Sequence, residues 1–383
     1  NFFKKIFPPN PFSKTFNLER MIKLGFNLKN NTSFTDILQT HAKRYPLMTP
    51  QDAVKLIYQA TFGVGHLLAD EETVRARIAE EMKTMLPADV PVTENIGGGF
   101  MRFHMNGTSI DRMTDLADLV SALFLEAGTH SSGTDEQFSA RLDILRTLTA
   151  DGVFPFGTDE LEAYLTEYLA GGLRAVSHSE AYRAAYHPAY RVVSRDLTLL
   201  LPLLDQIRDR MKYNAPVVLA IDGFCASGKS TLAARLAKIF GARLIHMDDF
   251  FLPPSKRTPE RFAEPGGNVD YERFYEEVVC HLTDDVLTYG VFDCSEMAVT
   301  HNAVLPKTPV TIIEGAYALH PHFGNYADIR AFMETDEAEQ KRRILGRDGE
   351  EMLAMFESRW IPFERNYEAA YGVRESCTYR ILT

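Results

Sequence analysis

The stretch Pro216-Val-Val-Leu-Ala-Ile221-Asp-Gly223-Phe-Cys-Ala-Ser-Gly228-Lys229-Ser230 decides the fold of the second half of the chain. Residues 216–221 form an unbroken apolar run, which is the pattern of a strand buried on both faces of a parallel sheet. A glycine-rich loop follows, and a helix is expected to begin at Lys229. Apolar strands alternating with helices recur downstream, at 244–246 and 310–313. The sequence therefore predicts an α/β domain, a parallel sheet flanked by helices.

The loop in this stretch fits the pattern G-x-x-x-x-G-K-[ST] at every fixed position, and it lies between a strand and a helix as that pattern requires. Its glycines let the backbone approach phosphate oxygens, and the N–H groups of the loop and helix N-terminus can bind the anion. Lys229 is expected to neutralise the β- and γ-phosphates, and the Ser230 hydroxyl to reach Mg²⁺. We expect ATP and Mg²⁺ here, with nucleotide contacts from Gly223, Ala226, Ser227, Gly228, Lys229, Ser230 and Thr231.

Carboxylates follow the two downstream strands. Asp248 and Asp249 come directly after the strand at 244–246, at the sheet edge where open α/β folds bind ligands. A carboxylate there can take the proton of an attacking hydroxyl, and the alternative is an aspartate that caps a helix or contacts the water shell of Mg²⁺. Glu314 ends another buried strand, where a carboxylate needs a cation or donors nearby. We expect Ser230 and Glu314 to hold the metal.

Two later segments supply further candidates. The turn at 264–271 presents Asp270 and Tyr271, which suit the hydroxyl pair of a sugar or polyol, although a plain surface turn has the same composition. Arg343 and Arg347 lie four residues apart, on one face of a predicted helix. They are expected to close over the phosphates and stabilise the charge of the transition state, against the alternative of a solvated basic face.

In this order, the elements resemble the uridine kinase branch of the P-loop kinases, which also includes phosphoribulokinase and pantothenate kinase. The resemblance covers roughly 215–383. It implies that Asp248, which opens Asp248-Asp-Phe-Phe251, is the base, and that the lid includes Arg342, Arg343 and Arg347. It also implies acceptor contacts from Asn268-Val-Asp270 and from Phe292 and Asp293. Because Cys294 replaces an aromatic residue of the family, the chain looks more like uncharacterised bacterial uridine kinase-like proteins than like a uridine kinase proper.

These residues predict a kinase that uses ATP and Mg²⁺ to phosphorylate a hydroxyl of a small metabolite, either a uridine-like nucleoside or a related sugar-like acceptor. The expected catalytic residues are Asp248, Lys229, Arg343 and Arg347. A rival hypothesis is a nucleotide-binding regulator, in which the P-loop domain switches a mostly helical domain at 32–212. Asp248 and Glu314 favour catalysis, because a pure switch needs no base on the acceptor side.

The preceding part of the chain, residues 32–212, has the periodicity of a mostly helical domain and carries no established catalytic motif. A cluster of tyrosines, arginines and a histidine at 182–191 is expected either to bind a phosphorylated or aromatic ligand or to pack between domains. His66 and His104 make only a weak metal pair. A strand is expected near 100–105, and helices at 50–62, 69–86, 110–127, 134–150 and 158–170.

Composition limits the remaining options. The 383 residues are 45% hydrophobic and 24% charged, which excludes a disordered or fibrous chain. A net charge of −11 argues against nucleic acid as a partner, and no apolar run is long enough for a membrane span. Four cysteines without a CxxC pair indicate a reducing compartment, so we expect a cytoplasmic protein. Its expected partner is the small acceptor, and homo-oligomerisation stays open.

The first 31 residues differ from the rest. They are rich in lysine and asparagine and contain a single acid, Glu19. They are expected to be a basic tail, either poorly ordered or docked on the body through Phe2, Phe3 and Phe7.

Overall fold

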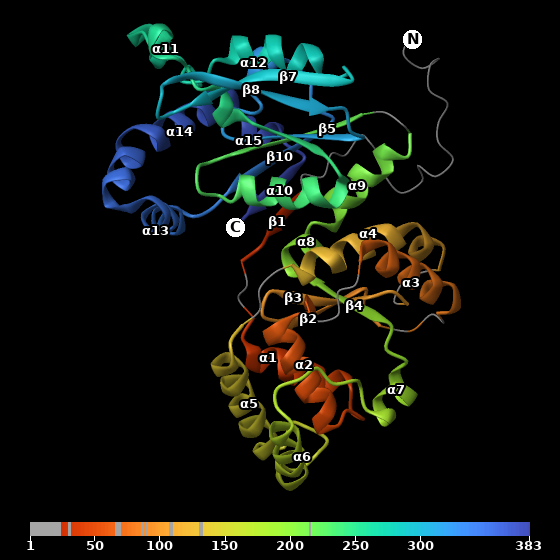
Figure 1. Cartoon of the computed structure of the whole chain (residues 1–383). Coiled ribbons are helices and arrows are strands. Elements are labelled where there is room, and N and C mark those ends of the chain that lie inside the picture. Colours follow the sequence, from red (N-terminus) through yellow and green to blue (C-terminus); the bar gives the residue numbers. More distant parts are fainter. Residues whose placement is uncertain are drawn as a thin grey trace. The chain divides into compact units, whose positions relative to one another are not determined.

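The computed structural model of the chain describes residues 24–29, 32–65, 70–85, 88, 90–106, 110–129, 133–213 and 216–383. They form two compact units (Figure 1). One unit is Leu28–Asp205, and the other combines Leu24–Asn27 with Gln206–Thr383. Among the described residues no helix is both long and apolar enough to cross a membrane.

The second unit is built on a six-stranded sheet in the order β1-β11-β10-β5-β9-β6. Every neighbouring pair is parallel, which confirms the predicted parallel sheet. The central strands β5 and β9 are buried along their whole length, as their apolar runs require. The strands are β1 (Leu24–Asn27), β5 (Val217–Gly223), β6 (Arg243–His246), β9 (Val310–Glu314), β10 (Ile329–Glu334) and β11 (Tyr379–Leu382).

The strand β1 corrects the prediction of a tail over residues 1–31. Leu24 to Asn27 pair with Tyr379 to Leu382 and form one edge of the sheet. The sequence gives little local signal for this strand, because four residues paired with the far end of the chain show no periodicity of their own. Phe2, Phe3 and Phe7, the residues of the proposed docking arm, lie outside the described residues.

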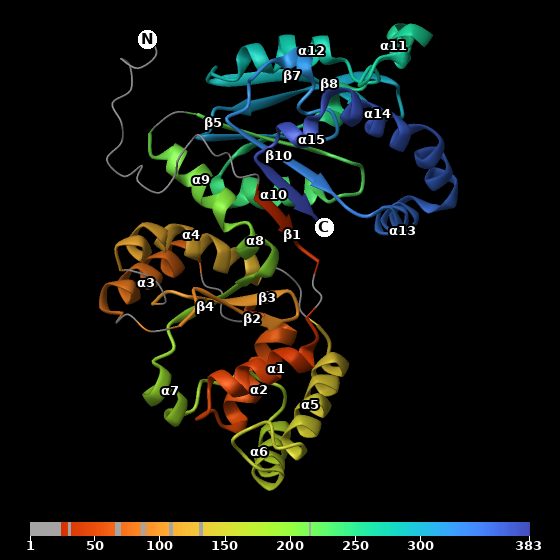
Figure 2. The ribbon, with the colours of Figure 1, turned by 180° about the vertical axis from the view of Figure 1, so that it is seen from behind.

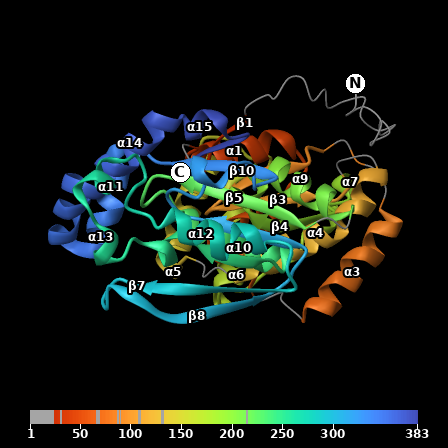
Figure 3. The same cartoon turned by 90° about the horizontal axis from the view of Figure 1, so that it is seen from above.

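Helices and a hairpin complete this unit. Helix α10 (Lys229–Phe240) directly follows the loop after β5, and Figure 2 shows α13 (Glu337–Met355) and α14 (Ile361–Tyr371) from the other side. Gly349 has φ 83° and interrupts α13. Strands β7 (Val286–Asp293) and β8 (Ala298–Pro306) form an antiparallel ribbon (Figure 3). The remaining elements are η3 (Met247–Phe250), η4 (Pro254–Lys256), α11 (Pro259–Ala263), α12 (Tyr271–Glu277), η5 (Val279–His281), η6 (Pro321–Phe323), η7 (Phe356–Trp360) and α15 (Val373–Ser376). Helix α9 (Leu201–Met211) begins in the unit Leu28–Asp205 and ends in this one.

The unit Leu28–Asp205 is mostly helical, and its predicted helices are confirmed to within two residues at each end. They are α2 (Pro50–Phe62), α3 (Glu71–Thr84), α4 (Ile110–Gly128), α5 (Asp135–Ala150) and α6 (Thr158–Ala170), joined by α1 (Phe34–Arg44), α7 (Glu180–Tyr186) and α8 (Arg195–Leu199). The unit also holds a three-stranded antiparallel sheet, of which the sequence predicted only β3 (Phe100–His104). Its other strands, β2 (Thr93–Gly97) and β4 (Tyr190–Ser194), are short, and polar side chains interrupt their apolar pattern.

Candidate functional site

The loop between β5 and α10 has a backbone that only certain residues tolerate. Gly223 has φ 142°, and a Cβ at this position would lie 2.0 Å from the carbonyl oxygen of Met333 in β10. Ala226 and Gly228 also have positive φ values, of 56° and 89°. Helix α10 begins at Lys229, and the N–H groups of its first turn have no partner within the helix. Together with the loop amides they make a concave set of donors suited to an anion.

Lys229 is buried against the loop, where it is expected to bind the phosphates. Its Nζ donates to the carbonyl oxygens of Gly223 at 2.9 Å and Phe224 at 2.8 Å. An ammonium group has three donors, so these two bonds fix its position and leave one for a ligand. The positive charge is therefore held at the loop in advance.

Ser230, Glu314 and His246 form a chain of hydrogen bonds beside the loop. The Ser230 hydroxyl donates to one oxygen of Glu314 at 3.1 Å, and Nδ1 of His246 lies 2.6 Å from the other. This bond raises the pKa of His246. His246 is absent from the sequence predictions, because its position opposite Glu314 follows from the pairing of β6 with β9.

The oxygen donors of Ser230 and Glu314 fit a hard divalent cation such as Mg²⁺. Among the described residues, no group of three or more His, Cys, Asp or Glu side chains is placed to hold a metal by itself. A cation at this site would therefore complete its shell with phosphate oxygens and water, as Mg²⁺ in nucleotide sites does.

Asp248 and Asp249 differ in what they contact, although both lie in η3. The carboxylate of Asp249 accepts a hydrogen bond from the Tyr289 hydroxyl at 3.0 Å. Asp248 is exposed, and within the described part of the chain its carboxylate accepts none of the hydrogen bonds found. The surrounding protein desolvates Asp248 and raises its pKa, Lys229 opposes the rise, and Glu314 adds to it. Asp248 is thus the open carboxylate next to the loop.

Two buried carboxylates that the sequence analysis missed accept hydrogen bonds from the backbone amides of the loop. Asp222 accepts from the amides of Gly223, Tyr317 and Leu319 and from the Tyr367 hydroxyl, at 2.6 to 3.1 Å. It therefore ties the end of β5 to the segment after β9. Its signal in the sequence is an acid at the end of an apolar run, the same signal that singled out Glu314.

The second of these carboxylates is Glu364 in α14. One of its oxygens accepts from the loop amide of Cys225 at 2.8 Å. Burial raises the pKa of Glu364 to about 7, while Lys229 and the Cys225 amide oppose the rise. At neutral pH this carboxyl is therefore close to half protonated, so it places less negative charge against the anion-binding loop than an ordinary glutamate would.

The two predicted lid arginines have different surroundings. Arg343 donates to the loop carbonyl of Ala226 at 3.0 Å and to the Thr383 hydroxyl at 2.9 Å. It thus braces the loop backbone. Arg347 is more exposed and bonds to Asp348, and the charge of Asp248 contributes to the rise in its pKa. The structure therefore brings Arg347 and Asp248 near each other.

The predicted acceptor residues make contacts within the fold. Both oxygens of Asp270 accept from Lys256 Nζ, at 3.0 and 2.9 Å, and Asp270 also caps α12. The buried carboxylate of Asp270 is thus engaged by Lys256, whose side chain is half-exposed, and the acceptor contact of Asp270 stays a prediction.

The other acceptor residues are similarly engaged. Tyr271 lies between Arg261, at 3.6 Å from its ring, and His320, at 4.6 Å between ring centres. Phe292 is buried, and Asp293 accepts from the backbone and hydroxyl of Ser295 in the β7–β8 turn. Their roles in ligand binding stay predictions.

In the other unit, His104 lies 3.5 Å from Glu94, and its suggested metal partner His66 lies outside the described residues. Tyr182 of the 182–191 cluster stacks on His178 at 4.1 Å and packs against Tyr45, so its packing lies within its own unit.

No protein-family model matches this chain. Among solved structures it is similar to a possible uridine kinase from Bacillus stearothermophilus, with 19% identity, coverage of 46% of this chain and 99% of that one, and a TM-score of 0.35. It is also similar to shikimate kinase from Bacteroides thetaiotaomicron, with 19% identity over 43% and 84% of the two chains and a TM-score of 0.23. The fold assignment rests on the parallel sheet and the loop described above.

Proposed function

We propose that this chain is an ATP- and Mg²⁺-dependent kinase that transfers the γ-phosphate to a hydroxyl group of a small metabolite. Nucleosides and related sugar-like compounds are the first candidates for the acceptor. The observation that carries the proposal is the open carboxylate of Asp248, beside the loop that holds Lys229 and the Ser230–Glu314 pair. A nucleotide-dependent regulator needs the loop but has no use for such a base.

The residues divide the reaction between them. The loop amides and Lys229 bind the phosphates, and Ser230 and Glu314 hold Mg²⁺, which when bound neutralises charge on the β- and γ-phosphate oxygens. Asp248 takes the proton of the acceptor hydroxyl as its oxygen bonds to the γ-phosphorus. The bond from that phosphorus to the bridging oxygen breaks, and ADP leaves with the electron pair. The raised pKa of Asp248 makes it a better proton acceptor than an ordinary aspartate.

The test compares Asp248→Asn with Asp249→Asn, two changes of identical chemistry on adjacent residues. An acceptor is first found by measuring ADP release with nucleosides, pantothenate, ribulose 5-phosphate, glycerate and sugars, using ATP and GTP as donors. For Asp248→Asn we expect kcat to fall by about 10²- to 10⁴-fold while ATP affinity changes by no more than a few-fold. Asp249→Asn is expected to be milder, because Asp249 is already bonded to Tyr289.

Other outcomes would change the assignment. Equal losses in both variants, or an Asp248→Asn defect that added Mg²⁺ repairs, would make Asp248 a metal contact. ATP binding that requires Lys229 but is followed by no transfer to any acceptor would favour the regulator.

A further inference from the structure

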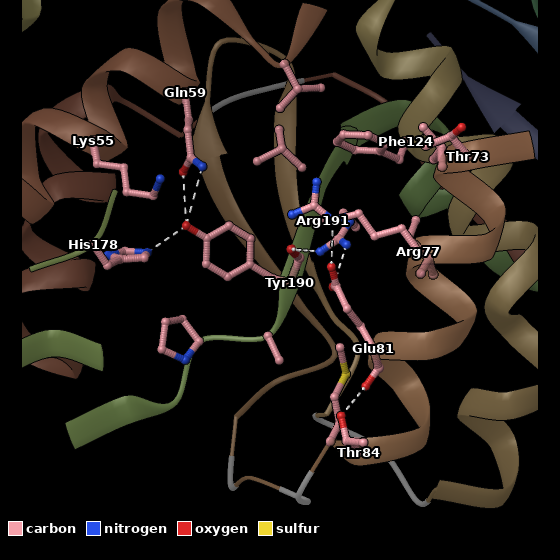
Figure 4. A pocket seen from close by; sticks show the side chains of 17 residues that line it. Lys55, Gln59, Thr73, Arg77, Glu81, Thr84, Phe124, His178, Tyr190 and Arg191 are labelled. Atoms are coloured by element: carbon pink, nitrogen blue, oxygen red, sulfur yellow. Dashed lines mark hydrogen bonds and ion pairs between the residues drawn. The ribbon is translucent and has the colours of Figure 1, made fainter. Parts of the chain in front are cut away.

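The unit Leu28–Asp205 contains a cavity of about 500 Å³ between α2, α3 and β4 (Figure 4). We call it the α2–α3–β4 cavity. Its size lies within the usual range for pockets that bind small molecules. A second hollow of about 290 Å³ shares Lys55, Gln59 and Val64 with it. Neither volume is lined by residues of the P-loop site.

The lining of this cavity is positively charged, although acids outnumber bases in the unit as a whole. Lys55, Arg77 and Arg191 line it together with one carboxylate, Glu81. Figure 4 shows both arginines converging on Glu81, which bonds Arg77 at 3.0 Å and Arg191 at 2.6 Å. Glu81 is thus the ion-pair partner of both guanidinium groups.

Within the described residues, the third cation, Lys55, has no carboxylate within ion-pair distance, although the charge of Asp52 acts on it from farther away. Its Nζ donates to the carbonyl oxygen of Val176 at 2.7 Å. Burial lowers the pKa of Lys55 to about 8, and nearby Arg102 adds to the decrease. A ligand anion would offset both effects, so this lysine favours an anionic group beside it.

On the same side of the cavity as Lys55 in Figure 4, a chain of hydrogen bonds ends at the Tyr190 hydroxyl. Buried Asp52 accepts from Nδ1 of His178 at 2.8 Å, and Nε2 of His178 lies 2.7 Å from the Tyr190 oxygen. Hydrogen bonds lower the pKa of Asp52, and burial lowers that of His178 to about 4. Because Asp52 stays ionised and takes the Nδ1 proton, we assign Nε2 as the acceptor and Tyr190 as the donor to it. The Tyr190 oxygen is then itself an acceptor.

Further buried groups contact the Tyr190 side chain and keep it in position. The Arg102 guanidinium lies 4.5 Å from the centre of the Tyr190 ring, and it donates to the Gln59 side-chain oxygen at 3.0 Å. The Gln59 nitrogen lies 3.4 Å from the Tyr190 oxygen. Burying so many polar groups is costly, and positions fixed in advance are what a binding site needs.

We propose that the α2–α3–β4 cavity binds a small metabolite that carries a carboxylate or phosphate group and a hydroxyl. The anionic group pairs with Lys55 beside Tyr190, and the guanidinium groups of Arg77 and Arg191, on the other side of Tyr190 in Figure 4, add positive charge to the lining. The ligand hydroxyl donates to the oxygen of Tyr190. The proposal does not depend on the kinase activity, because no residue of the P-loop site takes part.

Calorimetric titration of the whole chain tests the proposal with pairs of probes that differ in hydroxyl groups. One arm uses L-malate and succinate, the other glycerol 3-phosphate and propyl phosphate, so the two arms distinguish carboxylate from phosphate. We expect one arm to bind, with its hydroxylated member the tighter of the pair, and neutral glycerol to bind at least about 10-fold more weakly. Lys55→Met should weaken binding about 10- to 100-fold, because it removes a charged hydrogen-bond donor.

Tyr190→Phe should reduce the preference for the hydroxylated member by about 2- to 10-fold and leave binding of the other member unchanged. Lys83→Met, at an exposed lysine of α3 that pairs with Glu80, is the matched control and should bind as the unaltered chain does. Binding should persist in Lys229→Ala, which separates this site from the P-loop. Absence of binding at millimolar concentrations in both arms, or binding that Lys55→Met leaves unchanged, would overturn the proposal. Circular dichroism confirms that each variant folds.

Discussion

Replacing Glu364 by Gln tests whether burial raises the pKa of this carboxyl to near 7 in the folded protein. Burial raises the pKa of Glu364 from 4.5 to about 7. The folded state then binds the proton more tightly than the unfolded chain does, so stability falls as pH rises from about 4.5 to about 7 and stays lower above that range. A difference of about 2.5 in pKa corresponds to about 3 kcal/mol. Glutamine has no charge to desolvate, and its side-chain oxygen can still accept from Cys225.

We therefore expect Glu364→Gln to match the unaltered chain at pH 4.5 and to be more stable by up to about 3 kcal/mol at pH 8. The single tryptophan of the chain, Trp360, lies in the same unit a few residues before Glu364, so its fluorescence reports on the unfolding of that unit in urea. Glu351→Gln, at an exposed position of α13, is the control and should show no such pH dependence. An effect of Glu364→Gln that is equal at both pH values, or a loss of stability at pH 8, would refute the reasoning.

Three other changes give further predictions. Lys229→Ala removes the one point charge of the loop, so ATP binding measured by calorimetry should weaken and turnover should fall by at least about 100-fold, whereas full activity would contradict a nucleotide site here. Gly223→Ala would put a methyl group against the Met333 carbonyl, so urea unfolding should show a loss of about 1–3 kcal/mol or more, and a neutral effect would mean that the loop backbone adapts. Asp270→Asn removes the charge that faces Lys256 and should lower stability by about 1–3 kcal/mol with little change in acceptor KM, whereas a KM rise of about 5-fold or more would show that Asp270 contacts the acceptor.

The features that the sequence predicted correctly have local signals. The loop from Gly223 to Ser230 has a fixed spacing, β5 and β9 are unbroken apolar runs, and helices such as α5 and α6 carry caps and periodicity along their own length. Each of these patterns arises from neighbours in sequence, so no knowledge of the tertiary fold is needed.

The features that it missed depend on contacts between distant segments. Glu364 reaches Cys225 across the fold, and His246 reaches Glu314 only because β6 pairs with β9. Asp270 was correctly noticed as an acid after a glycine pair, but no pattern shows that Lys256 would occupy both of its oxygens. The sequence thus locates the chemical groups and cannot tell which of them another side chain has already engaged.

The pairing of β1 with β11 has a consequence for the order of events during synthesis. The register joins Leu24 to Tyr379, so the edge of the sheet cannot close until nearly all of the described chain has been translated. At ribosomal rates of about 5–20 residues per second, β1 waits on the order of tens of seconds for its partner. A strand of four residues is a short template for wrong pairing during that delay. The three strands of the Leu28–Asp205 unit pair only with one another, so this unit can finish folding on the ribosome while β1 is still waiting.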